Sequence, residues 1–160
     1  MIRAVTPADA QALADLYNPY VRDTTITFEE EPVTAEEMAI RIAKVTAGHP
    51  WLVWAEGDRV LGYAYASVWR ARPAYRHSTE TAIYLAPDQQ GRGLGIALYR
   101  ALLDELRARG FHLVLGGVAL PNEASARLHE RLGFQKVGHM REAGRKFDRW
   151  IDVGFWELLL

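Results

Sequence analysis

The sequence predicts an α/β (α+β) fold with a mixed, mostly antiparallel sheet of about seven strands and helices on both faces. Segments rich in β-branched and aromatic residues are interspersed with segments whose apolar residues recur at helical spacing. Residues that form turns or helix caps separate these segments. The length of 160 residues is typical of one domain, so we expect residues 1–160 to form a single domain.

A short strand and a helix are expected at the start of the chain. Residues 2–5 read as the strand. Thr6-Pro7-Ala8-Asp9 then supplies an N-cap, a proline at the first helical position and an acid at the third, so a helix should run to about Val21. Residues 23–28 are rich in threonine and favour extended backbone, as a loop or a sheet edge.

A second helix and a hairpin should follow. The capping box at residues 34–37 predicts a helix that ends near Gly48. Strands at 51–56 and 59–69 flank Gly57-Asp58, whose glycine tolerates the positive φ of a two-residue hairpin turn. The sheet is therefore expected to contain an antiparallel pair here.

In the second half of the chain, strands and helices alternate. Glycines close the two helices, and an asparagine opens the second one. The expected elements are a strand at 78–86, a helix at 96–109, a strand at 112–118, a helix from Asn122 to Gly133, and strands at 134–140 and 151–159.

Three glycines, Gly91, Gly93 and Gly95, lie between an expected strand and an expected helix. Such a turn lets the backbone approach a pyrophosphate and aim N–H groups at it, although glycines also serve ordinary tight turns. A dinucleotide-binding fingerprint would require the third glycine one residue later, and a Walker loop would require a lysine after its second glycine. Both of these nucleotide-binding motifs are excluded.

The residues around these glycines, Gln90-Gly91-Arg92-Gly93-Leu94-Gly95, resemble the Gln/Arg-x-x-Gly-x-Gly/Ala pyrophosphate loop of the GNAT superfamily of N-acetyltransferases. Residues 122–134 are similar to a late helix of that superfamily, with asparagine at the start and Leu-Gly-Phe at the end. Further matches span nearly the whole chain and resemble the phosphinothricin and methionine sulfoximine N-acetyltransferases. They are Tyr17-Asn18, Val21, Thr24, Thr27-Phe28, Glu31-Pro32, residues 69–72, Tyr75, Glu80, Gly144, Lys146, Trp150 and Asp152.

This resemblance implies direct transfer of an acetyl group, within a ternary complex, from acetyl-CoA to the α-amino group of a small amino-acid analogue. Phosphinothricin, L-methionine sulfoximine and L-methionine sulfone are such acceptors. Acetylation of a different amine or of a peptide N-terminus stays open, as does a sensor that binds acyl-CoA without turnover. The chain has no cysteine, which is no obstacle because direct attack needs no covalent enzyme intermediate.

The resemblance also assigns residues to acetyl-CoA. In the superfamily, the strand before the pyrophosphate loop separates from its neighbour, and its free backbone groups pair with the pantetheine arm. The residues assigned to acetyl-CoA are Ile83, Tyr84, Leu85, Gln90, Gly91, Arg92, Gly93, Leu94, Gly95, Ile96, Asn122 and Ser125. Asn122 also has an ordinary role as the N-cap of its helix.

Two residues are candidates for proton transfer. Glu80 lies in a mostly apolar strand, where a carboxylate is costly unless it is paired or hydrated, so it is either a general base or part of a surface salt bridge. His129 falls with Asn122 and Ser125 on one polar stripe of its helix, opposite Leu128 and the other apolar residues. It is either an acid or an aid to the base, as the resemblance suggests, or an ordinary surface histidine.

The acceptor is expected to meet the loop that follows residue 69. A guanidinium pairs well with the carboxylate of an amino acid, and Arg72 and Tyr75 match the family there. Phe28 could form an apolar wall beside the acceptor side chain. For any single arginine, a solvated loop charge is the alternative.

Charge and composition limit the other partners. The formal net charge is −1 and charges of both signs alternate, so no nucleic-acid or membrane surface is expected. The histidine and carboxylate spacing indicates no metal site. A cytoplasmic protein is expected because no leader or spanning segment is visible. The resemblance and the aromatic residues Trp69 and Trp150–Trp156 favour a homodimer.

Overall fold

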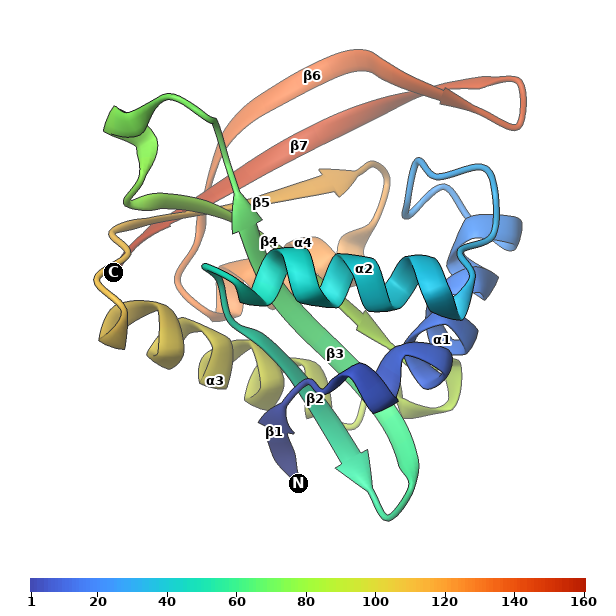
Figure 1. Ribbon diagram of the computed structural model, residues 1–160. Helices are drawn as coiled ribbons and strands as arrows, with labels where there is room; N and C mark the ends of the chain where they lie inside the picture. Colours follow the sequence, from blue (N-terminus) through green and yellow to red (C-terminus); the bar gives the residue numbers. More distant parts are fainter.

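The computed structural model describes residues 1–160 and contains one seven-stranded sheet, with strand order β1-β2-β3-β4-β5-β7-β6 (Figure 1). The expected mixed sheet with helices on both faces is confirmed. The strands are β1 (Ile2–Ala4), β2 (Trp51–Glu56), β3 (Arg59–Val68), β4 (Ser78–Leu85), β5 (Leu113–Ala119), β6 (Gln135–Lys146) and β7 (Arg149–Leu159). The helices are α1 (Ala10–Asp23), α2 (Ala35–Thr46), α3 (Leu94–Ala108) and α4 (Glu123–Arg131), with 3-10 turns at Pro7–Asp9, Pro73–Tyr75 and Pro87–Gln89.

Two apolar clusters hold the helices against the sheet. Tyr63 of β3 packs with the buried residues of α1 and α2 on one face, whereas Ala64 and Ala66 pack with those of α3 and with apolar residues of α4 on the other. Successive side chains along a strand point to opposite faces, so Tyr65 and Ser67 share the α1/α2 face with Tyr63. Both faces of the sheet are therefore covered.

Two of the predicted helix caps agree with the sequence, whereas the Thr6 hydroxyl makes no cap and donates a hydrogen bond to the Asp9 carboxylate at 3.0 Å. The Thr34 hydroxyl accepts a hydrogen bond from the Glu37 N–H at 3.1 Å, and the Asn122 side chain accepts one from the Ser125 N–H at 3.1 Å. Helix α3 begins at Leu94, two residues earlier than predicted. No helix has both the length and the apolar character needed to cross a membrane.

The pairing of β4 with β5 is the only parallel contact in the sheet, and it is short. It runs from Ser78 opposite Leu113 to Thr81 opposite Gly116. Beyond Thr81, β4 continues to Leu85 alongside β3, and β5 continues alongside β7. The two strands therefore separate, and the edge of β4 that faces β5 has no strand partner there.

The end of the chain differs from the prediction. Strands were expected at 134–140 and 151–159, but β6 and β7 form one long hairpin that extends beyond the helices (Figure 1). Its turn is Phe147-Asp148, in which both residues have positive φ, 51° and 56°. This is the backbone of a tight hairpin turn without its usual glycine, so the sequence carried no turn signal.

Candidate active site

The glycine turn leads directly into α3. Gly91 and Gly93 have φ values of 76° and 80°, a conformation that other residues rarely adopt, and an added Cβ at either would contact no other atom. Leu94 and Gly95 lie in the first turn of α3, where backbone N–H groups have no partner within the helix. The turn and the helix dipole thus present free donors and open space to an anion, as a pyrophosphate requires.

A narrow cavity of about 60 Å³ lies where β4 and β5 separate. Its lining includes the predicted cofactor residues Ile83, Tyr84, Asn122 and Ser125, together with His129. Leu85 does not line it, and its carbonyl accepts a hydrogen bond from the Tyr20 hydroxyl at 2.6 Å. The unpaired edge of β4 can bind an extended chain such as pantetheine through backbone hydrogen bonds.

Glu80 lies in a second cavity, of about 320 Å³, on the α1/α2 face of the sheet. Its carboxylate forms neither an ion pair nor a hydrogen bond with the chain, so the salt-bridge alternative finds no partner. Burial raises the pKa of the Glu80 carboxyl above its usual value. Gly117 is directly beside it, because a Cβ there would lie 3.2 Å from Glu80 Oε1. A carboxylate with these properties is suited to accept a proton near neutral pH.

The two cavities adjoin each other. They share six lining residues, which are Ile26, Thr81, Ala82, Tyr84, Gly117 and Ala119. Ala82 and Tyr84 are on the same face of β4 as Glu80, as strand alternation predicted. An extended group in the cleft between β4 and β5 can therefore reach the space that Glu80 faces.

His129 is buried, with 4% of its surface exposed, so the alternative of an ordinary surface histidine is wrong. Its ring packs against the rings of Tyr99, Phe134 and Trp156. Gly116 provides the space for it, because any Cβ at that position would overlap the imidazole. The polar stripe of α4 consequently faces the sheet rather than solvent, whereas Ala124, one of the apolar residues on the side of Leu128, is exposed.

The hydrogen bonds of His129 determine its tautomer. Nδ1 lies 2.7 Å from the Ser125 carbonyl oxygen, which can only accept, so Nδ1 carries the hydrogen. Burial lowers the pKa of His129 despite this hydrogen bond, so the ring is neutral at pH 7. Nε2 therefore accepts a hydrogen bond from the Tyr99 hydroxyl at 3.2 Å.

Tyr99 and Thr81 were not predicted from the sequence as site residues. The Tyr99 hydroxyl hydrogen-bonds to the Thr81 hydroxyl as well as to His129, and both residues line the cleft between β4 and β5. In the sequence, Tyr99 resembled a core residue of α3 because it follows Leu98 in an apolar run. The one available signal was a tyrosine among leucines, since a buried hydroxyl requires a polar partner.

Phe28 lines the Glu80 cavity, where it was expected. Its segment is fixed by the end of the β6–β7 hairpin, since buried Lys146 donates a hydrogen bond to the Thr27 carbonyl at 2.8 Å. Gly144 leaves the space that the Phe28 ring occupies. Gly144 and Lys146, which carried family resemblance without an assigned role, thus position the wall of the cavity.

Arg72 and Tyr75 do not reach this cavity within one chain. Both are exposed, and their loop, green in Figure 1, lies on the left of the view, whereas the blue segment around Phe28 lies on the right. Only the base of the loop is near the site, through Trp69, whose ring is 6.0 Å from that of Phe155 in the cavity wall. No cluster of three His, Cys, Asp or Glu side chains that could hold a metal ion is present.

Comparison with known proteins gives a consistent result. The family model of the acetyltransferase (GNAT) domain matches residues 2–154. The phosphinothricin N-acetyltransferase of Streptomyces coelicolor is 47% identical over 160 residues, covering 98% of this chain and 94% of that protein. The L-methionine sulfoximine/L-methionine sulfone acetyltransferase of Pseudomonas paraeruginosa is 38% identical, covering 99% and 94%. A crystal structure of a phosphinothricin acetyltransferase (Pat) from Sinorhizobium meliloti in complex with AcCoA has a TM-score of 0.96 at 36% identity, covering 100% of this chain and 88% of that one.

Proposed function

The chain belongs to the GNAT family of acetyl-CoA-dependent N-acetyltransferases, and we propose that it acetylates the α-amino group of an amino-acid analogue such as phosphinothricin, methionine sulfoximine or methionine sulfone. The names of the relatives support this acceptor class. The observation that carries the proposal is that the β4–β5 cleft and the Glu80 cavity adjoin each other, at the six residues that line both. Acetyl-CoA enters by the cleft, and the acceptor amine approaches from the cavity.

The reaction is a direct transfer in this geometry. Glu80, through a water molecule, removes a proton from the acceptor ammonium. The neutral amine attacks the thioester carbonyl, whose oxygen receives a hydrogen bond from a free N–H of β4, and the C–S bond breaks. The nitrogen then loses its second proton to give the neutral amide, and the departing thiolate takes up one proton to give CoA with a free thiol.

His129 has a positioning role in this scheme. Its single N–H is occupied by the Ser125 carbonyl, so the neutral ring has no proton to give to the thiolate. Its Nε2 instead holds the hydroxyl of Tyr99 at the wall of the cleft. The Tyr99 hydroxyl has one hydrogen, which Nε2 accepts in this structure, so Tyr99 can hydrogen-bond to the departing thiolate by turning that hydrogen away from Nε2.

A panel of acceptors tests the function. Purified enzyme with acetyl-CoA should release free thiol in the presence of phosphinothricin, methionine sulfoximine and methionine sulfone, and mass spectrometry should find the N-acetyl products. Thiol release only with polyamines, arylamines or a peptide N-terminus would show that the acceptor belongs to one of those classes instead. Tight acetyl-CoA binding without thiol release for any amine would support the sensor instead.

The role of the glycine turn can be tested with a matched pair of variants. Gly93 and Gly110 have the same φ of 80°, and an added Cβ contacts nothing at either position. Gly93→Ala and Gly110→Ala should therefore each cost about 1 kcal/mol of folding stability. Only Gly93→Ala should weaken acetyl-CoA binding in calorimetry, because its methyl group competes with the pyrophosphate. Equal affinities for the two variants would leave the glycines a structural role alone.

We further propose a homodimer whose contact brings Arg72 to the acceptor carboxylate. The exposed apolar side chains of the β6–β7 hairpin, Val137, Met140, Phe147 and Trp150, support an interface there. Trp156 does not contribute to it as expected, because it is buried in the core. Light scattering should give about twice the chain mass of 18.0 kDa.

Arg72→Ala should raise KM for amino-acid acceptors about tenfold, because a charge-assisted hydrogen bond is lost. Amines without a carboxylate should be affected far less. If Arg72 acts across the interface, mixing Arg72→Ala with Glu80→Gln chains should restore about a quarter of the wild-type rate at low acceptor concentration, since half of the dimers then hold one intact site. No recovery in mixed dimers would contradict the contribution from the partner.

A further inference from the structure

A third cavity, of about 410 Å³, extends the acceptor site beneath α2. Its apolar part is formed by Met38 and Val45 of α2 and by stacked aromatic rings, with those of Trp51 and Tyr65 4.4 Å apart. Tyr65 and Ser67 line this cavity and also the Glu80 cavity. The two cavities therefore adjoin each other at these residues, on the α1/α2 face of the sheet.

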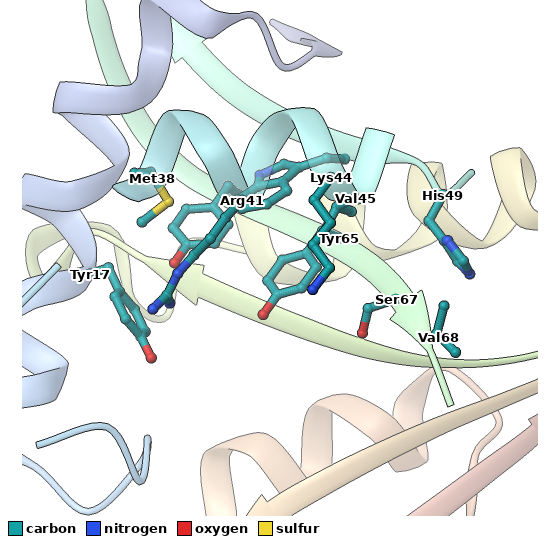
Figure 2. Close-up of a pocket in the computed structure, with 11 residues that line it drawn as sticks. Tyr17, Met38, Arg41, Lys44, Val45, His49, Tyr65, Ser67 and Val68 are labelled. Carbon is teal, nitrogen blue, oxygen red and sulfur yellow. The ribbon is translucent and has the colours of Figure 1, made fainter. Parts of the chain in front are cut away.

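The polar groups of this cavity that have no partner in the chain include those of Tyr65, Ser67 and Lys44. The Tyr65 and Ser67 hydroxyls form no hydrogen bond with another residue, and the amino group of Lys44 forms no ion pair. Figure 2 shows the ends of these three side chains pointing in the same direction, beside β3. They are donors, so together they can hold an oxygen-rich group.

The surrounding charges favour an anion at Lys44. Arg41 also lines the cavity, but its guanidinium is already bound to Glu29 at 2.5 Å and to Glu37 at 3.2 Å. Lys44 is exposed and has no carboxylate partner in the chain. Glu80 lines the adjoining cavity, so the two cavities together place a carboxylate at one end and the Lys44 amino group at the other.

The distances match a side chain of moderate length. Ser67 is directly opposite Glu80 across the β3–β4 pair, which places their Cβ atoms roughly 5 Å apart. Tyr65 follows on the same face of β3, roughly 7 Å further along. A side chain as long as that of methionine, attached to an α-amino group at Glu80, reaches the hydroxyl of Tyr65.

We propose that the cavity under α2 is the subsite for the acceptor side chain, and that Lys44 and Tyr65 select side chains that end in an oxo group, anionic ones most strongly. The methylene groups of the acceptor lie on the aromatic rings, and the terminal oxygens meet the amino group of Lys44 and the Tyr65 hydroxyl. This inference rests on the proposed function, because it requires an amino acid as the acceptor.

The test compares three acceptors that share the α-amino and α-carboxylate groups and differ at the end of the side chain. Phosphinothricin ends in an anionic phosphinate, methionine sulfone in a neutral sulfonyl group, and methionine in a thioether without oxygen. Lys44→Met should lower kcat/KM about tenfold or more for phosphinothricin, and less for methionine sulfone and for methionine, in that order. The preference for phosphinothricin over methionine should thus collapse, and Lys44→Arg should retain part of it.

Arg100→Met is the matched control, because it removes an exposed cation from α3 on the other face of the sheet. It should leave the preference among the three acceptors unchanged. Calorimetric titration of phosphinothricin into enzyme saturated with CoA should show the same loss of affinity for Lys44→Met without turnover. Equal losses for all three acceptors, or none, would overturn the subsite while leaving the acetyltransferase activity in place. Failure of wild-type enzyme to acetylate any of the three would instead overturn the proposed function and the subsite with it.

Discussion

Glu80→Gln should reduce kcat about a hundredfold or more while changing KM little, because a general base acts mainly in the transition state. The substitution keeps the shape of the side chain and removes its ability to take a proton. Steady-state thiol release at pH 7 with saturating acetyl-CoA measures the effect. A rate equal to that of the wild type would remove Glu80 from the mechanism.

The pH dependence gives an independent measure of the same role. Glu80 must be ionised to act, so wild-type kcat/KM should rise with pH through the pKa of its carboxyl, which burial places above the usual value. His129 contributes to the same acidic limb, because it must stay neutral and its pKa is lowered. In Glu80→Gln, the residual kcat/KM should no longer rise with pH through the pKa of Glu80.

Stability provides the control against misfolding. The pKa of Glu80 is raised in the folded state, so the folded protein binds its proton more tightly than the unfolded chain. The stabilisation from the protonated carboxyl is complete below the unfolded pKa and is lost as the pH rises through the folded one. Above the folded pKa the wild type therefore contains a half-buried carboxylate without a partner, and there Glu80→Gln should have an equal or higher Tm although it is nearly inactive.

Most of the fold was predictable because local signals coincide with element ends. The cap at Thr34, the glycine at the end of α3 and the alternation along β4 each depend on a few neighbouring residues. The β6–β7 hairpin was missed because its turn, Phe147-Asp148, adopts positive φ without glycine. That conformation is imposed by the pairing of the two long strands rather than by the turn residues.

The candidate site was predictable to the extent that its residues belong to contiguous motifs. The glycine turn, Glu80, Phe28 and Asn122 lie where they were expected. The burial of His129 depends on Gly116 of β5 and on Phe134, which lies beyond the end of α4. Neither residue belongs to the helix, so the pattern of α4 alone could not show that His129 is buried. The cavity under α2 combines Lys44 with Tyr65 and Ser67 across tertiary structure, and no sequence spacing connects them.

His129→Phe should lower kcat about tenfold to a hundredfold at pH 7.5 and should change KM for acetyl-CoA little. A loss of this size corresponds to the free energy of one hydrogen bond to a charged group. Phenylalanine keeps the packing against Phe134 and Trp156 but leaves the Tyr99 hydroxyl without its acceptor. If His129 acts through Tyr99, then Tyr99→Phe should cause a similar loss, and the double variant should be no slower than either single one.

An imidazole that itself gave a proton to the thiolate would produce the opposite pattern, with His129→Phe far slower than Tyr99→Phe.

Denaturant unfolding at several pH values gives a second test, because it measures how protonation of the buried imidazole changes the free energy of unfolding. The pKa of His129 is lowered in the folded state, so its contribution to stability is complete above the unfolded value of about 6.5 and is lost as the pH falls through the folded pKa. The wild type should therefore lose more stability between pH 7.5 and pH 5 than His129→Phe does, because the variant has no buried imidazole to protonate.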